Sequence, residues 1–383
     1  MLTVTVGLAP GAQSVGSALG WGGVVPGASV QIQRQGSSGV VSAVTDAQGT
    51  VSFSGLLPGG YSVTAGRALN PSEKGILATA GVEADALGGG LGFTVTAPSS
   101  AVTVPASAGV RGSLVLSELS YSYIRDPAAG DYSAGQFFEI YNNSDTTIFL
   151  DGKTVFKGLR GWWHYPVEDF DCDYYNPFNY DPLGIWSQRI YRFPGAGTDY
   201  PLAPGEVAVL ATDAIDHAAI VTGGPNLTNA DFEFRGATDV DNPSVPDMLS
   251  IGAADGGLSG HGLILFNTRE VLALAEYVDP AALPAAQIFA TGIPHHRIPK
   301  ALLLDVVTLR QNSVEQYAPC GPSSVHPTFD QHDAKLISRY DPNTAQRRVL
   351  LVGPGGRKVL QRTGTSSVDF FAGSPTPGSL PEP

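Results

Sequence analysis

The chain consists of short segments in which apolar and polar residues alternate, and each segment ends at glycine, proline, aspartate or serine. Alternation over about four to eight residues is typical of a half-buried β-strand, and such frequent turns leave little room for long helices. In the N-terminal part these segments are Leu2–Val6, Ala28–Arg34, Val40–Thr45, Thr50–Gly55 and Gly60–Ala65. The pattern predicts an all-β protein that begins with a small β-sandwich.

Charged residues are sparse, and acidic ones predominate. The chain has 22 Lys and Arg against 35 Asp and Glu, which gives a net charge of -13. Such a chain offers no cationic surface to a phosphate backbone or an anionic membrane. The apolar runs Leu302–Val307 and Val349–Val352 are far shorter than the roughly 20 residues that cross a bilayer. We therefore expect no nucleic-acid partner and no membrane-spanning segment.

The turn motifs of the N-terminal part follow one another in a characteristic order: Pro26-Gly27-Ala28, then Thr45-Asp46-x-x-Gly49, then Phe53-x-x-Leu56-x-Pro58-Gly59-x-Tyr61-x-Val63. This order resembles the carboxypeptidase-regulatory-like or Cna-B-like transthyretin fold. The resemblance implies a transthyretin-like β-sandwich over residues 1–97, which in those families is a stalk, spacer or assembly unit without chemistry. Lys74, the module's only lysine, lies in a loop-like segment with no sign of an isopeptide arrangement.

Residues 98–112 are rich in Ala, Ser, Pro and Gly and are predicted to be a linker. Beyond them come the motifs L-x-L-S-E-L at Leu114–Leu119, F-x-E-I-Y-N-N-S at Phe137–Ser144, and I-x-L-D-G at Ile148–Gly152. This order resembles lamin-tail-type Ig-like domains of bacterial surface proteins of unknown function. The resemblance implies a larger β-sandwich over 113–375 with insertions at 155–200 and 270–300. Later segments fit it: Leu202–Ala211, Gly262–Phe266, Leu303–Val307, Leu360–Arg362 and Asp369–Phe371.

The Ala-rich run between Val271 and Pro299 predicts one or two short helices, with Asp279 as the cap and Pro280 in the first turn. Residues 376–383 form a Pro-rich tail of a kind that is normally disordered. If both chain ends are ordered instead, the strand-forming N-terminus and the extended tail suit the exchange of strands between subunits.

An aromatic-rich insertion spans residues 161–194. It is either an interaction surface or an Ω-loop folded over a small core of its own. The residues that we assign to such a surface are Trp162, Trp163, Tyr174, Tyr175 and Trp186.

Cys172 and Cys320 are the only cysteines, and both lie in irregular segments. A disulfide between them would stabilise the fold by roughly 4–5 kcal/mol if their Cα atoms approach to about 6 Å. Two unpaired thiols are the alternative.

Asp169, Asp171 and Asp173 place carboxylates at alternate positions, as calcium-binding loops do. The segment departs from the EF-hand pattern, because Tyr174 stands at the position of the turn glycine and no Glu closes the loop. Solvated carboxylates beside packed aromatic rings are the alternative, and no other cofactor is expected. A second, weaker acidic stretch contains Asp239, Asp241, Asn242 and Asp247.

No catalytic motif organises the polar residues. Neighbouring His295 and His296 point apart in an extended segment, and no Gly-x-Ser-x-Gly elbow is present. We therefore predict a protein that is not an enzyme. Its expected role is that of an extracellular structural or interaction protein, such as the repeating subunit of a filament, whose partners are other copies or other cell-surface proteins. The alternative is a glycan-binding or ligand-binding accessory lipoprotein of an outer-membrane receptor that uses the loop 161–194.

The expected location is the cell surface. Met1 runs directly into a strand without a signal peptide, which taken literally indicates the cytoplasm. However, scarce Lys, two Cys, two Met and abundant Ser, Thr and Gly are common in exported bacterial β-proteins. We expect an exported protein whose leader is absent from this numbering.

Overall fold

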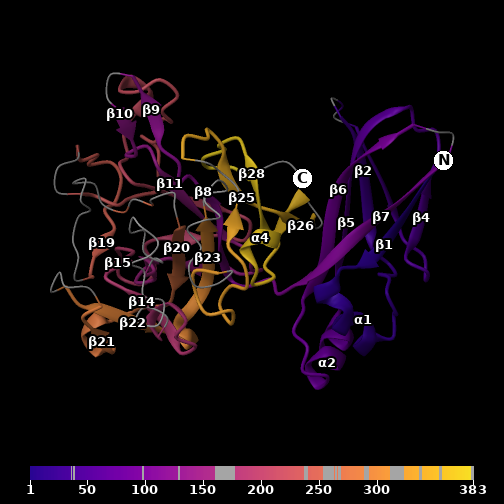
Figure 1. The fold of residues 1–383 in the computed structure, drawn as a ribbon, viewed down its shortest axis with the longest axis horizontal. Coiled ribbons are helices and arrows are strands. Elements are labelled where there is room, and N and C mark those ends of the chain that lie inside the picture. Colours follow the sequence, from indigo (N-terminus) through magenta and orange to yellow (C-terminus); the bar gives the residue numbers. More distant parts are fainter. Residues whose placement is uncertain are drawn as a thin grey trace, which may run out of the picture. The chain divides into compact units, whose positions relative to one another are not determined.

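The computed structural model describes residues 1–35, 37, 39–96, 99–127, 130–159, 177–236, 240–252, 263, 265, 269–288, 293–310, 323–335, 339–352 and 356–380. They form two compact units. Unit 1 comprises Met1–Arg111 with Arg348–Thr363, and unit 2 comprises Gly112–Arg347 with Gly364–Glu382. Strands in several sheets dominate both units, which confirms the all-β prediction (Figure 1). Each helix among the described residues is too short or too polar to cross a membrane.

Unit 1 is a seven-stranded sheet that folds over a single core, in the order β3-β2-β5-β6-β7-β1-β4. Strand β7 pairs in parallel with β1 through residues 100–106 and antiparallel with β6 through residues 107–109. It therefore belongs to both halves of the sheet. Val4 of β1, Val30 of β2 and Val63 of β5 lie in one buried cluster, so the two halves enclose a sandwich core. The strands are β1 (Leu2–Leu8), β2 (Ser29–Arg34), β3 (Val40–Val44), β4 (Thr50–Phe53), β5 (Gly59–Ala68), β6 (Ala86–Val95) and β7 (Ser100–Gly109).

Two short helices, which the sequence analysis did not predict, belong to unit 1. They are α1 (Gln13–Leu19), preceded by the 3-10 turn η1 (Pro10–Ala12), and α2 (Pro71–Thr79). Helix α2 begins with a capping box, because the Asn70 side chain accepts from the Glu73 N–H while the Glu73 side chain accepts from the Asn70 N–H. The two helices pack against each other (Figure 1).

Two segments differ from the predicted domain boundaries. Most of the expected linker 98–112 is strand β7, whose Val104 and Ala106 are fully buried in the core of unit 1. Small residues there reflect close packing rather than a flexible connection. The segment around Leu360, which we assigned to the second domain, belongs to unit 1 as the antiparallel pair β26 (Val349–Val352) and β27 (Lys358–Leu360).

Glycines let this pair of strands approach the sheet of unit 1. Leu350 and Val359 bury Ala86 of β6, and β26 lies against β5 and β6 (Figure 1). A Cβ added at Gly88 would overlap the carbonyl oxygen of Leu350, and one at Gly66 would lie 2.7 Å from the Cβ of Leu351. The Gly-rich sequence of β6 therefore marks a close approach of two backbones.

Unit 2 is a sandwich of two six-stranded sheets, as the lamin-tail-like resemblance implies. One has the order β18-β17-β11-β8-β25-β28 and the other the order β19-β15-β13-β20-β23-β24. Leu116 and Ile140 of the first sheet share a buried core with Val155, Leu274 and Val307 of the second. The strands are β8 (Leu114–Leu119), β11 (Phe137–Asn142), β17 (Val207–Ala211), β18 (Phe232–Glu233), β25 (Thr344–Arg347), β28 (Phe370–Gly373), β13 (Thr154–Lys157), β15 (Arg189–Arg192), β19 (Leu249–Ser250), β20 (Arg269–Ala275), β23 (Leu303–Arg310) and β24 (Ala334–Lys335).

The Ala-rich segment that we expected to contain short helices contributes the end of β20, the short strand β21 and the strand β22. Its one described helical turn is the 3-10 turn η4 (Pro280–Ala282), where the Asp279 side chain accepts from the Ala281 N–H as predicted. Of the predicted strand 262–266, only Leu263 and Leu265 are described, and both are buried. The smaller elements are β9 (Ile124–Asp126), β10 (Gly130–Tyr132), β12 (Ile148–Phe149), β14 (Gly184–Ser187), β16 (Pro201–Leu202), β21 (Ala285–Ala286), β22 (His295–Pro299), η3 (His217–Ala219), η5 (Lys300–Leu302) and α4 (Ser366–Asp369).

The contact at Gly88 makes a testable prediction. Gly88→Ala forces the new methyl group against the backbone of Leu350. We expect it to destabilise unit 1 by about 1–3 kcal/mol, the usual cost of overpacking. Gly92→Ala is the matched control, because the nearest atom to its Cβ is 3.9 Å away. It should change the unfolding free energy by less than about 0.5 kcal/mol. Urea unfolding measures both, and equal effects would contradict this account.

Candidate functional site

A β-bulge between β8 and β11 brings two glutamates together. Leu119 lies opposite Phe138 and Leu116 opposite Ile140, with a shift of register between these pairs. Ser117 and Glu118 therefore share the position opposite Glu139. Because Leu116 and Leu119 both point into the core, the bulge turns the Glu118 and Glu139 side chains towards the other face of the sheet.

These two glutamates hold the C-terminal tail. Glu118 accepts hydrogen bonds from the Thr376 N–H at 3.1 Å and from the Thr376 hydroxyl at 2.7 Å. The Thr344 hydroxyl donates to the same carboxylate at 2.5 Å. Glu139 accepts from the Gly378 N–H at 2.7 Å. The Pro-rich tail is thus fixed to its own chain through residues 376–378, although its composition is of a kind that is normally disordered.

Gln346 of β25 completes this arrangement, which we call the tail clamp and define as Glu118, Glu139, Thr344, Gln346 and Thr376. The Gln346 Nε2 donates to the carbonyl of Ser374 at 2.5 Å and to the Thr376 hydroxyl oxygen at 3.2 Å. Gln346 is only 2% exposed, so its amide is shielded from solvent. The clamp therefore joins β8, β11 and β25 to the chain that follows β28.

Burial and the negative charge of Glu118 raise the pKa of Glu139 to about 9. The hydrogen bonds from Gly378 and Ser117 act in the opposite direction and are weaker than the effect of burial. Glu139 is therefore neutral at pH 7 and carries a proton next to the Glu118 carboxylate. Two carboxyl groups side by side keep different protonation states for the same reason in many buried pairs.

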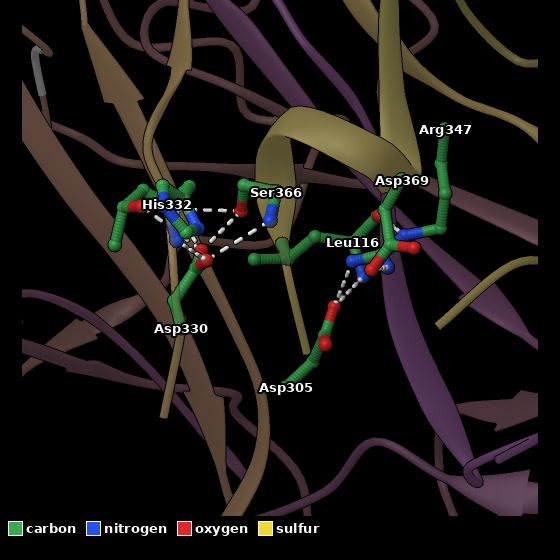
Figure 2. Close-up of polar contacts among 8 residues, drawn as sticks. Leu116, Asp305, Asp330, His332, Arg347, Ser366 and Asp369 are labelled. Atoms are coloured by element: carbon green, nitrogen blue, oxygen red, sulfur yellow. Dashed lines mark hydrogen bonds and ion pairs between the residues drawn. The ribbon is translucent and has the colours of Figure 1, made fainter. Parts of the chain in front are cut away.

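On the opposite face of β25, Arg347 forms a buried ionic network (Figure 2). Its Nη2 contacts the Asp305 carboxylate at 2.5 Å, and its Nη1 lies 3.6 Å from Asp369. Its Nε donates to the carbonyl of Leu116 at 2.7 Å, while Asp305 also accepts from the Leu116 N–H at 2.9 Å. One guanidinium thus connects β8 of the first sheet, β23 of the second and the end of α4.

Asp330 is the centre of a second buried cluster (Figure 2). Its carboxylate accepts from the Thr308 hydroxyl at 2.9 Å, from the Ser366 hydroxyl and N–H, and from the His332 N–H at 3.2 Å. Burial raises the pKa of Asp330 to about 7, although the bonds from Ser366 and Thr308 oppose the rise. The Ser366 hydroxyl is bonded to a carboxylate rather than to an imidazole, so the cluster is not a nucleophilic triad.

Trp186 is the one residue of the predicted aromatic surface that the structure describes, and it is buried. It is 8% exposed, its Nε1 donates to Asp181 at 3.0 Å, and its ring packs against Phe178. With Leu159 and Ile288, which lie outside the loop 161–194, it forms a small buried cluster. The other predicted residues lie outside the described residues: Trp162, Trp163, Asp169, Asp171, Cys172, Asp173, Tyr174, Tyr175 and Cys320. The calcium site and the disulfide stay predictions.

The second acidic stretch is partly described. Carboxylate oxygens of Glu233, Asp241 and Asp247 lie within 4.8 Å of one another. The Arg235 Nη1 lies 3.4 Å from both Asp241 and Asp247 and balances part of their charge. Asp239 lies outside the described residues. The Arg235 guanidinium therefore already lies where a bound cation would neutralise this cluster.

Glu118 and Glu139 stand in the motifs that carry the family resemblance, but the tail clamp was not predicted from the sequence. A signal was present in the spacing, because Leu116 and Leu119 are three residues apart, whereas residues on one face of a regular strand are an even number apart. Two core residues at that spacing require a bulge. That Thr376 returns to the bulge was not visible, because tertiary contacts between distant segments leave no local pattern.

Comparisons with known proteins agree with this architecture. Residues 20–86 match the family model of the carboxypeptidase regulatory-like domain, which confirms the resemblance of the N-terminal module. No curated protein matches the chain. The chain is similar in fold to a solved DUF4876 family protein from Bacteroides thetaiotaomicron, at 18% identity and a TM-score of 0.59. That similarity covers 99% of this chain and 98% of the other, so both units share the fold.

A 5-hydroxyisourate hydrolase from Klebsiella pneumoniae matches 28% of the chain at 20% identity and is itself covered over 91% of its length. Its TM-score of 0.18 is too low to indicate a shared fold. The two informative matches are named as a regulatory-like domain and a protein of a family with no assigned function. Neither name includes a catalytic activity.

The raised pKa of Glu139 predicts a specific pH dependence. The carboxyl group has a pKa of about 9 in the folded chain and its ordinary 4.5 when unfolded. Its contribution to stability is therefore complete below about pH 4.5 and is lost as the pH rises towards 9. Glu139→Gln cannot lose a proton and should not show this loss. Between pH 5 and pH 9, we expect the unfolding free energy of the variant to increase by more than about 1 kcal/mol relative to that of the wild type. Urea unfolding at each pH measures this difference.

Glu83→Gln, at an exposed glutamate, is the control for a general change of charge. A difference between Glu139→Gln and the wild type that stays constant over this pH range would contradict the assignment.

The buried network around Arg347 makes a second prediction. Arg347→Met fills a similar volume but leaves Asp305 and Asp369 buried without their cation. We expect a loss of about 3–5 kcal/mol in the unfolding free energy. Arg339→Met is the matched control, because Arg339 pairs with Asp131 at an exposed position. It should cost at most about 1 kcal/mol. Similar losses for both variants would refute the distinction.

Proposed function

We propose that this chain is a non-enzymatic structural or interaction protein of the bacterial cell exterior, and that copies of it associate into a filament or surface assembly. The observation that carries the proposal is the edge strand β3. It is the last strand of the sheet in unit 1, and among the described strands it pairs with β2 alone. An unprotected edge strand presents unpaired N–H and C=O groups to a second chain.

The side chains of β3 support this role. Val40, Val41 and Val44 are 52%, 54% and 63% exposed, and the strand Val40–Val44 has no charged residue and no proline. Lysine, proline or a bulge normally protects such an edge from pairing. The pairing of β3 with β2 runs from Val40 to Val44 without a shift of register, so the edge is regular.

The edges of the two six-stranded sheets in unit 2 are less suited to pairing. In unit 2 the edge strands β18, β19 and β24 are each two residues long. Strand β28 is followed directly by the tail that Glu118 and Glu139 hold. The N-terminal strand β1 lies between β7 and β4 and is not available to a neighbour. The exchange of terminal strands considered from the sequence is therefore less favoured than pairing at β3.

The tail clamp and the two buried polar clusters support a structural role. The carboxylates of Asp305, Asp330 and Glu118 accept hydrogen bonds from the chain's own backbone. Carboxylates that accept hydrogen bonds from backbone N–H groups fix the positions of the segments that donate them. The sparse lysines and the regulatory-like module, which in its families is a spacer or assembly unit, favour a location outside the cell. Glycan binding by the loop 161–194 has no support from Trp186, which is buried.

The proposal predicts that the native protein, recovered from cells, forms a lattice or fibre in negative-stain microscopy. Val41→Lys places a charge on the edge strand and should abolish the assembly while leaving the fold intact. Val240→Lys is the matched control, since it adds the same charge at a valine that is 68% exposed and lies outside the strands. A monomeric native protein, or an assembly that Val41→Lys leaves unchanged, would contradict the proposal.

A further inference from the structure

The hydroxyl of Thr376 lies between a carboxylate and a carboxamide. It donates to the Glu118 Oε2 at 2.7 Å, and its oxygen accepts from the Gln346 Nε2 at 3.2 Å. An amide C–N bond is about 1.3 Å long, so the Gln346 Cδ is within about 4.5 Å of the hydroxyl oxygen. A small side-chain rotation brings these atoms to the separation of about 3–3.5 Å from which such reactions start.

We propose that Thr376 and Gln346 form an intramolecular ester bond, with Glu118 as the base. This bond attaches the C-terminal tail covalently to β25. The inference concerns a single chain and does not depend on the proposed assembly. It assigns a modification site to three residues of the tail clamp.

The reaction balances without any further reagent. The Thr376 hydroxyl transfers its proton to the Glu118 carboxylate while its oxygen attacks the Gln346 Cδ. The C–N bond of the tetrahedral intermediate then breaks, and the proton passes from Glu118 to the leaving nitrogen. One molecule of ammonia departs, an ester joins the two side chains, and Glu118 is ionised again. A hydroxyl that is a weak nucleophile by itself becomes reactive beside such a general base.

The surroundings position the amide for this step. A Cβ at position 373 would overlap the Gln346 Oε1, so glycine at that position lets the amide lie against the backbone of β28. The Ser374 carbonyl accepts from the Gln346 Nε2 at 2.5 Å and holds the nitrogen that would leave. The Thr344 hydroxyl donates to the other oxygen of Glu118 and orients the base.

Water and charge are also controlled at this position. Gln346 is 2% exposed, which limits hydrolysis of an ester formed there. Glu139 beside Glu118 is neutral at pH 7, since its pKa is raised to about 9, so a single negative charge faces the hydroxyl.

Intact mass spectrometry of the full chain under denaturing conditions tests the proposal. The expected mass is that of the sequence less one ammonia. Trypsin should yield the peptide Tyr340–Arg347 joined to the peptide that begins at Thr363, and hydroxylamine should separate them. A wild-type chain whose mass equals that of its sequence, with both peptides recovered separately, overturns the proposal. So does a loss of ammonia that maps to other residues.

Variants identify the roles of the three residues. Thr376→Val removes the nucleophile at nearly constant volume, and Glu118→Gln removes the base but keeps a hydrogen-bonding side chain. Both should show the full mass of their sequences. Ser379→Ala is the matched control, because Ser379 contacts the Thr376 carbonyl from an exposed position. It should still lose one ammonia. A bond that persists in Glu118→Gln would refute the assigned base.

Discussion

A single buried arginine joins the two sheets of unit 2. Arg347 contacts the backbone of β8 in one sheet and Asp305 of β23 in the other, with Asp369 of α4 nearby. A buried cation requires its counter-charges at fixed positions, because none of the three groups can be hydrated in the core. The network therefore fixes the position of β25, and with it that of Gln346 and Thr344 on the opposite face of the same strand. The geometry of the tail clamp depends on this anchor.

The short segments between turn residues predicted five of the seven strands of unit 1, and the first motif of the second domain predicted β8. Strand β8 spans the predicted residues Leu114–Leu119, and β2 to β5 lie within one to three residues of their predicted bounds. The prediction of strands failed where small residues allow backbones to approach closely. Strand β6 contains Gly88, which contacts Leu350, and β7 contains the Ala and Ser residues that we interpreted as a linker. Glycine and alanine are neutral in sequence patterns, but here they permit contact between elements distant in the chain.

The candidate site was predictable in part. The two glutamates stand in motifs that the sequence analysis quoted, and the spacing of Leu116 and Leu119 contains the bulge that brings the glutamates together. Their partners Gln346 and Thr376 follow more than two hundred residues later, one before and one after the segment that contributes β26 and β27 to unit 1. Such a return can be seen only in three dimensions. The aromatic loop had the strongest compositional signal, but its Trp186 is buried in a small hydrophobic cluster.

The pair β26 and β27 also determines when unit 1 can be completed. The ribosome produces β1 to β7 first, yet Leu350 and Val359, which cover Ala86, are added only after most of unit 2 has been synthesised. A nascent chain must therefore keep part of the sheet of unit 1 open until residue 363 has emerged. Completion of unit 1 therefore depends on a segment that follows most of unit 2 in the chain. Replacement of residues 112–347 by another module would have to preserve the return of Arg348–Thr363 to unit 1.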